Sequence, residues 1–120
     1  MIKFKDPSIE KEWYQLPVQN KRLYKLILAL EQFLDLEIKK DLVITEIYRD
    51  AATNTAQGGI PNSPHLSWQA VDLRSSIYTN AEIERIKSFL NQFTFRNGKQ
   101  VCVYHAVTGG AFHMHIQYAK

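Results

Sequence analysis

The stretch AFHMHIQY, residues 111–118, decides how this sequence is expected to fold. Apolar and polar residues alternate along it, and side chains two positions apart on a β-strand lie on the same face of a sheet. The apolar face, which supplies the core, carries Phe112, Met114, Ile116 and Tyr118. The opposite face carries His113, His115 and Gln117. The alternation therefore predicts a half-buried strand that presents two imidazole groups away from the core.

Two segments have the apolar spacing of amphipathic helices. Asn20 can cap a helix over about residues 21–36, in which leucine and isoleucine recur every three or four positions. Thr79 and Glu82 have the spacing of a capping box, and the apolar positions that follow it extend to Phe93. We expect both helices to pack their apolar faces against a sheet.

Other segments have strand or turn composition. The run LVITEIYR (42–49) is rich in β-branched and aromatic residues, and Trp68–Arg74 resumes that character after a loop at 50–64. Asn97-Gly98, between FTFR and KQVCVYH, is a strong hairpin signal. The whole pattern predicts one α+β domain over residues 1–120, with a small antiparallel sheet flanked by two or three helices.

Composition limits the possible functions. The chain has 120 residues, 45% of them hydrophobic, a formal net charge of +3 and one cysteine, Cys102. Its basic residues are scattered, so nucleic-acid binding is not expected, and neither a signal peptide nor membrane insertion is expected. We expect a monomer that is cytoplasmic at synthesis. With a single cysteine, any metal site must use histidine and carboxylate ligands.

A metal site can be proposed from these residues. His65 stands seven residues before Asp72 at a loop-to-strand junction, and the HMH strand offers a further histidine. Catalytic zinc takes three protein ligands of this kind and leaves a fourth position open. A His and an Asp at this spacing also occur by chance, and His-x-His can be a surface feature. The residues alone leave both interpretations open.

The stretch YRDAATNTAQGGIPNSPHLSWQAVDLR (48–74) resembles a family signature, Y-R-(x)n-N-(x)n-G-G-(x)n-S-x-H-x-x-G-x-A-x-D. It is that of the zinc D-alanyl-D-alanine carboxypeptidases and L-alanyl-D-glutamate endopeptidases, which cut peptidoglycan stem peptides and include many phage endolysins. HMHIQ resembles the family's closing His-x-His element, and hedgehog signalling domains share the zinc-site pattern. The matching residues are Tyr48, Arg49, Asn54, Gly58, Gly59, Ser63, His65, Ala70, Asp72 and His115.

The resemblance implies a role for each matching site residue. His65, Asp72 and His115 would be the ligands of Zn²⁺. Arg49 would contact the carbonyl or carboxylate of the substrate, and Ser63 would line the site. A guanidinium beside a metal ion can stabilise the oxyanion of a tetrahedral intermediate. Glu46, close to Arg49 in the sequence, is expected to take part in an ion pair.

Two departures from the signature affect the expected site. Trp68 replaces the glycine that follows H-x-x, and its indole is expected to narrow the groove or alter substrate choice. The family usually places an Asp, Glu or His before the last ligand as general base, but residues 106–112, AVTGGAF, contain no carboxylate. His113 is the favoured base and His105 the second candidate. Alternatively, His113 orients a ligand or the substrate.

The resemblance favours zinc-dependent hydrolysis of an amide bond in a peptidoglycan stem peptide. The protein would act on the cell wall after release from the cytoplasm, in a phage or prophage context. The missing carboxylate supports an alternative, a zinc-stabilised cell-wall-binding module or a phage structural domain that catalyses no reaction. The sequence does not decide which peptide bond would be cut.

Overall fold

The computed structural model describes residues 1–93, 99–106 and 112–120. The helices are α1 (Pro7–Gln19), α2 (Lys21–Phe33), α3 (Ala51–Ala56) and α4 (Asn80–Asn91), together with a π-helical turn η1 (Leu34–Ile38) and a 3-10 turn η2 (Pro64–Ser67). The strands are β1 (Ile2–Phe4), β2 (Leu42–Glu46), β3 (Ala70–Arg74), β4 (Cys102–Ala106) and β5 (Phe112–Gln117).

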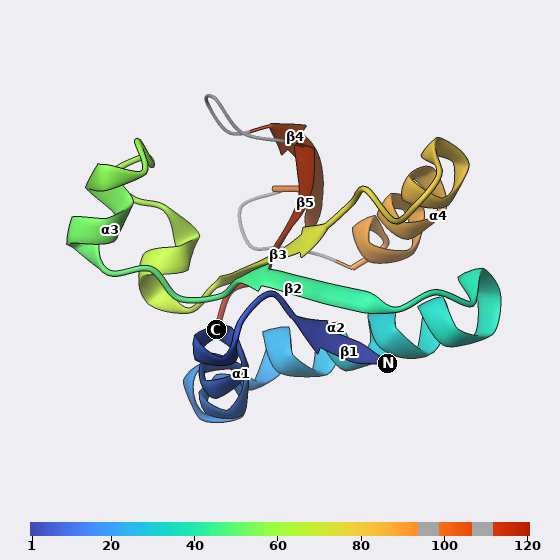
Figure 1. The fold of residues 1–120 in the computed structure, drawn as a ribbon, viewed down its shortest axis with the longest axis horizontal. Helices are drawn as coiled ribbons and strands as arrows, with labels where there is room; N and C mark the ends of the chain where they lie inside the picture. The colour runs from blue at the N-terminus through green and yellow to red at the C-terminus, as the bar shows by residue number, and fades with distance from the viewer. Residues whose placement is uncertain (94–98, 107–111) are drawn as a thin grey trace.

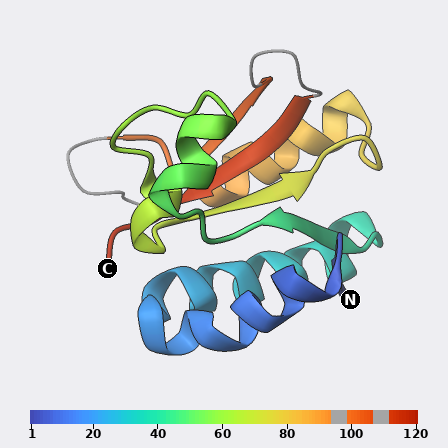
Figure 2. The ribbon, with the colours of Figure 1, turned by 60° about the vertical axis from the view of Figure 1, so that its left-hand side comes forward.

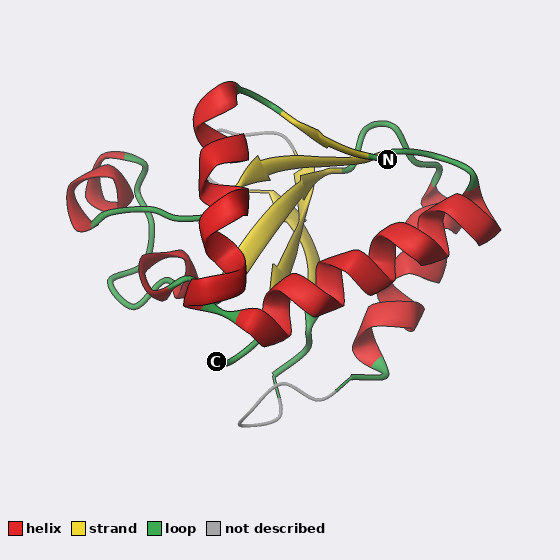
Figure 3. Cartoon of the chain, turned by 90° about the horizontal axis from the view of Figure 1, so that it is seen from below, coloured by secondary structure: helices red, strands yellow, loops and turns green. Residues whose placement is uncertain are grey.

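The strands form one five-stranded sheet in the order β1-β2-β3-β5-β4 (Figure 1). β1 pairs with β2 in parallel, and the other three pairings are antiparallel. Figure 2 shows α1 and α2 side by side along the sheet, and Figure 3 shows the same helices from below. The predicted α+β class, with a mostly antiparallel sheet flanked by helices, is confirmed.

The hydrophobic core lies between α1, α2, α4 and one face of the sheet. Its largest fully buried side chains are Leu16, Leu23, Ile27, Leu30, Leu34, Leu42, Ile44, Ile47, Leu73, Ile86, Leu90 and Met114. The opposite face of the central strands is thereby left for polar side chains. None of the helices that the structure describes is long and apolar enough to cross a membrane.

The alternation along β5 is confirmed at its centre. Met114 and Ile116 are fully buried, whereas His113 and His115 point to the opposite face and are partly exposed. Phe112 was expected in the core but is 58% exposed. It is the first residue of β5, and its ring stacks on Tyr104 instead.

Both predicted helix starts are confirmed, and the second helix ends earlier than expected. The Asn20 side chain accepts a hydrogen bond from the backbone N–H of Leu23, and the capping box of α4 is complete. The α-helical hydrogen bonding of α2 ends at Phe33 and gives way to η1. α4 ends at Asn91, so Phe93 lies beyond it and is 38% exposed.

The strands are shorter than their composition suggested. β2 ends at Glu46, where its pairing with β3 shifts register, so Tyr48 and Arg49 lie outside the sheet. β3 begins at Ala70, because Trp68 closes the turn η2. The expected loop at 50–64 contains α3, whose first turn is capped by the carboxylate of Asp50.

The predicted Asn97-Gly98 turn and most of its FTFR strand lie outside the described residues. The second predicted strand of that hairpin contains β4, which pairs with β5. β4 includes Cys102, which is fully buried beside Val101, as expected of a small apolar side chain. Burial raises the pKa of the Cys102 thiol to about 12, so it stays protonated at neutral pH.

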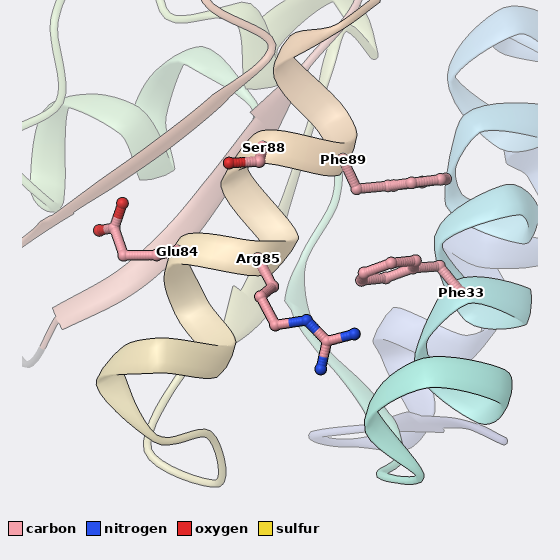
Figure 4. Close-up of a pocket in the computed structure, with 5 residues that line it drawn as sticks. All are labelled: Phe33, Glu84, Arg85, Ser88 and Phe89. Atoms are coloured by element: carbon pink, nitrogen blue, oxygen red, sulfur yellow. The ribbon is translucent and has the colours of Figure 1, made fainter.

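A shallow hollow of about 450 Å³ lies between α2 and α4 (Figure 4). The rings of Phe33 and Phe89 stack in it at 4.5 Å, and the Arg85 guanidinium lies 5.9 Å from the Phe33 ring. Arg85 also faces the Glu37 carboxylate at 3.4 Å. These contacts join the two helices, and the lining contains no histidine or cysteine. We therefore assign the hollow to helix packing.

We predict that Asn20→Ala lowers the free energy of unfolding by about 2–3 kcal/mol, measured by chemical denaturation. Asn20 is buried, caps α2, and donates hydrogen bonds to the carbonyls of Trp68 and Tyr118. One side chain thus joins the start of α2 to the end of η2 and to the segment after β5. Asn80→Ala, at an exposed position of α4, is the control and should change stability by less than about 0.5 kcal/mol. Equal effects of the two substitutions would contradict this role of Asn20.

Candidate metal centre

Asp72 and His115 are neighbours because of the register between β3 and β5. They are direct cross-strand partners, and both point away from the core. The Asp72 Oδ1 and His115 Nδ1 atoms lie 3.0 Å apart. Two of the three predicted ligands are therefore brought together by the pairing of the central strands.

His65 reaches the same carboxylate from η2. The Ser63 hydroxyl caps this turn by accepting a hydrogen bond from the backbone N–H of His65 at 3.3 Å. The His65 ring is 2% exposed, and its Nδ1 lies 2.8 Å from the carbonyl oxygen of Ile47. A carbonyl only accepts, so Nδ1 carries the proton and the lone pair of the neutral ring is on Nε2. Nε2 lies 3.2 Å from Asp72 Oδ2.

The donor set fits a zinc ion. His65, Asp72 and His115 each offer one ligand atom, and these atoms lie within 4.8 Å of one another. Zinc–ligand bonds of about 2.0–2.1 Å in a tetrahedron separate ligand atoms by about 3.3 Å, close to the His65–Asp72 distance. His65 Nε2 is buried and has no hydrogen bond of acceptable geometry within the described part of the chain. A metal ion at this point would satisfy that nitrogen.

The electrostatics of the site keep the carboxylate ionised. Burial alone would raise the pKa of Asp72, but the adjacent imidazoles of His115 and His65 outweigh it and hold that pKa well below its usual value. Burial alone would also lower the pKa of His65, yet Asp72 makes the net shift upward. Asp72 is thus ionised at neutral pH, as a candidate metal ligand requires.

The three side chains lie in a cleft of about 660 Å³. Its wall comes from the ends of β1 and β2, the segment after α3, η2, and the strands β4 and β5. Other predicted site residues that line it are Arg49, Ser63, His105 and His113. The structure thus brings together all the residues predicted as ligands or bases, within a cavity large enough for several residues of a peptide.

The guanidinium of Arg49 is held on two sides. Its Nε donates to the carboxylate of Glu46, which confirms the expected ion pair, and its Nη1 donates to Asn54 Oδ1 at 2.8 Å. The backbone N–H of Arg49 donates to the carbonyl of His65 at 3.2 Å. Arg49 is therefore tied both to the strand end and to the turn that carries a predicted ligand.

Asn54 and the two glycines complete this wall, and their packing was not predicted. Asn54 is 4% exposed, and its amide donates to the Ile60 carbonyl at 2.7 Å. Gly58 adopts φ +70°, as a tight turn allows. A Cβ on Gly59 would lie 2.1 Å from Asn54 Oδ1 and 2.8 Å from Arg49 Nη1, so any other residue here would displace these two side chains. The position of Asn54 within the matching stretch was the signal available in the sequence.

The two candidate bases lie beside the donor set. His113 Nε2 is 3.5 Å from Asp72 Oδ2, and the His113 ring packs at 4.7 Å against that of His105, its cross-strand partner. Burial and the neighbouring histidines lower the pKa of His105, which keeps it neutral at pH 7. Gln117, not singled out from the sequence, faces His115 Nε2 with its Oε1 at 3.3 Å. Both candidate bases thus lie inside the cleft, beside the candidate ligands.

The family model described as Peptidase M15 matches residues 8–117, almost the whole chain. The chain belongs to the peptidase M15 family. The resemblance found in the sequence is thereby confirmed, and the zinc dependence of M15 peptidases agrees with the His-Asp-His set. Comparisons with curated proteins and with solved structures gave no match.

Trp68 shows why the M15 signature has glycine at its position. The residue has φ +60° and ψ 32°, a left-handed conformation that disfavours residues with a Cβ. Its indole stacks on the ring of Tyr48 at 4.8 Å and packs against the core. It is absent from the residues that line the cleft. The contacts seen for Trp68 are therefore packing contacts, and its predicted role in substrate binding remains a prediction.

We predict that the metal-free protein binds one Zn²⁺ per chain, measured by equilibrium dialysis with elemental analysis. At free zinc of about 100 times Kd, the free energy of unfolding should rise by about 2.7 kcal/mol. His65→Ala and the nearly isosteric Asp72→Asn should lose this zinc, whereas His105→Ala, a matched change in the same cleft, should keep it. One bound zinc in His65→Ala, or none in the parent, would show that the ligand set is wrong.

We also predict that Trp68→Gly is more stable than Trp68→Ala by about 1 kcal/mol, because only glycine adopts a left-handed backbone at no steric cost. Both variants lose the stack on Tyr48, so the difference between their free energies of unfolding reports the cost of the left-handed backbone alone. Thermal and urea unfolding give the two values. Equal stabilities would mean that residue 68 does not keep its left-handed conformation in solution.

Proposed function

We propose that this protein is a zinc peptidase that hydrolyses an amide bond in peptidoglycan stem peptides. One observation carries the proposal: three ligand atoms converge within 4.8 Å inside a cleft that a guanidinium also lines. Membership of the M15 family supports the same reaction class. The chemistry requires a metal, a base and an oxyanion partner within one cavity, and candidates for all three are present.

In this proposal His65, Asp72 and His115 hold the metal. When bound, Zn²⁺ acts as a Lewis acid and lowers the pKa of water towards about 7. The Ile47 carbonyl fixes the tautomer of His65, so its Nε2 faces the metal position. Gln117 orients the His115 ring through its Nε2. The ligands are thus held in place before any substrate enters.

His113 is the proposed general base. It would accept the proton of the water that attacks the scissile carbonyl carbon, and would return a proton to the amine as the C–N bond breaks. Its Nε2 lies beside the Asp72 carboxylate, which stabilises the imidazolium formed between these two steps. His105 packs on His113 and is the second candidate for the same role.

Arg49 is proposed to stabilise the carbonyl oxygen as it becomes negative. Its bonds to Glu46 and Asn54 fix the plane of the guanidinium, so little reorganisation is needed when charge develops. Ser63 lines the same cleft and would contact the peptide, as would Trp68 if the substrate extends past Tyr48.

The second candidate function is a zinc-stabilised cell-wall-binding module, or a phage structural domain, without catalysis. One observation favours it: the cleft contains no carboxylate that is free to act as base, within the residues the structure describes. Glu46 is paired with Arg49. Asp72 belongs to the three proposed metal ligands, His65, Asp72 and His115, called the metal set below. This alternative predicts zinc binding and peptide binding without product.

The test is the release of new amino groups from purified peptidoglycan by the zinc-loaded protein. We expect His65→Ala to abolish release through loss of zinc, and His113→Ala to lower it about 10²- to 10⁴-fold while zinc remains bound. Phe112→Ala, an exposed neighbour of His113 on β5, is the matched control and should keep full activity. Analysis of the released peptides by mass spectrometry then separates carboxypeptidase from endopeptidase action.

Two outcomes would count against these assignments. Full activity in His113→Ala would remove His113 as the base and direct attention to His105. A parent protein that binds zinc but releases nothing from any stem peptide would favour the binding module. In the hydrolytic case, the protein would act on the cell wall after leaving the cytoplasm.

A further inference from the structure

The cleft contains charges that the proposed reaction does not use. Its ionisable lining, apart from histidines, consists of Lys5, Glu46, Arg49, Asp72 and Lys99. Asp72 belongs to the metal set, and Glu46 pairs with Arg49. Neither Lys5 nor Lys99 forms an ion pair with a carboxylate anywhere in the described ranges. Two cationic groups therefore lack an ion-pair partner among the described residues, in a cleft that would gain positive charge if a divalent metal bound.

Lys5 has a fixed backbone at one edge of the sheet. It directly follows β1, and its N–H donates to the Ile44 carbonyl at 2.9 Å, which continues the pairing with β2. The adjacent acid, Asp6, does not neutralise it by an ion pair. The Asp6 carboxylate accepts hydrogen bonds from the backbone of Ser8 and Ile9 and caps α1. The Lys5 ammonium group is thus available to the cleft.

Lys99 comes from the opposite edge. It precedes β4, the last strand in the sheet order, and the next residue is held where the Gln117 amide donates to the Gln100 carbonyl at 2.8 Å. The metal set lies on β3, β5 and η2, between the two edges. Cationic side chains therefore lie on both sides of the position where the scissile amide would bind.

We propose that Lys5 and Lys99 select stem peptides that carry free carboxylates outside the scissile amide, and discriminate against peptides in which those groups are amidated. The proposal rests on the proposed function and specifies the substrate of the same site. A carboxylate gains Coulomb energy from each lysine, whereas a neutral amide of nearly the same size gains almost none. The two substrates have nearly the same shape, so the cleft can distinguish them only by the charge of the carboxylate.

The test uses two synthetic stem tetrapeptides. One has every carboxylate free, and the other has its carboxylates amidated except at the C-terminus. We expect the parent to have a higher kcat/KM for the free acid than for the amide. Lys5→Gln and Lys99→Gln should each lower kcat/KM for the free acid by about 3- to 5-fold, the effect of losing a partly exposed ion pair. The double variant should nearly abolish the preference. Turnover of the amide should fall by less than turnover of the free acid, because the amidated peptide presents fewer carboxylates to the lysines.

Three controls separate charge from structure. Lys25→Gln makes the same charge change at an exposed position of α2 outside the cleft and should leave the preference intact. Lys5→Arg keeps the positive charge and should retain most of the preference for the free acid. Raising the salt concentration should reduce the preference in the parent but not in the double variant. An equal kcat/KM for the two peptides in the parent, or an unchanged preference in the double variant, would overturn the proposal.

Binding distinguishes this proposal from the hydrolytic one. If neither peptide is cleaved, both are titrated into the zinc-loaded parent and double variant by calorimetry or NMR. Tighter, lysine-dependent binding of the free acid would support charge selection while the hydrolytic function fails. Equal binding of acid and amide would overturn charge selection even if the parent cleaves peptidoglycan.

Discussion

The pairing of Asp72 with His115 across β3 and β5 is the constraint on which the rest of the site depends. A shift of one residue in this register would turn one of the two side chains into the core, because side chains alternate between faces. The register is fixed by fully buried neighbours on the two strands, Val71, Leu73, Met114 and Ile116. Each contributes about 1.5–3 kcal/mol by burial, so apolar packing on one face determines the geometry of the polar groups on the other.

The same arrangement explains how a buried carboxylate is tolerated. Asp72 is 5% exposed, and an isolated charge at that depth would be costly. Ring nitrogens of His65, His113 and His115 all lie within 3.5 Å of its oxygens, so polar contacts surround the carboxylate. A divalent ion bound at this point would compensate its negative charge directly.

Local signals carried the successful predictions. The caps at Asn20 and Thr79 and the alternation along β5 depend on neighbours in sequence, so the sequence alone identifies them. The end of β2 does not follow from composition, since the register shift before Glu46 comes from pairing with β3. β1, which carries the chain to Lys5, was also missed because its parallel partner is distant in sequence. Spacing and family resemblance singled out the candidate ligand residues, but their convergence is a product of tertiary structure.

Trp68, which stands where the signature has glycine, joins the turn that carries His65 to the segment that carries Arg49. The indole follows the turn that carries His65 and stacks on Tyr48, which directly precedes Arg49. The Tyr48 N–H donates to the Glu12 carboxylate of α1 at 3.0 Å, so this segment is also anchored to the helical layer. The bond from the Arg49 N–H to the His65 carbonyl runs between the same two segments. The cost of the left-handed backbone at residue 68 is thus offset by a ring contact between the His65 turn and the segment that leads into Arg49, a contact that a glycine could not provide.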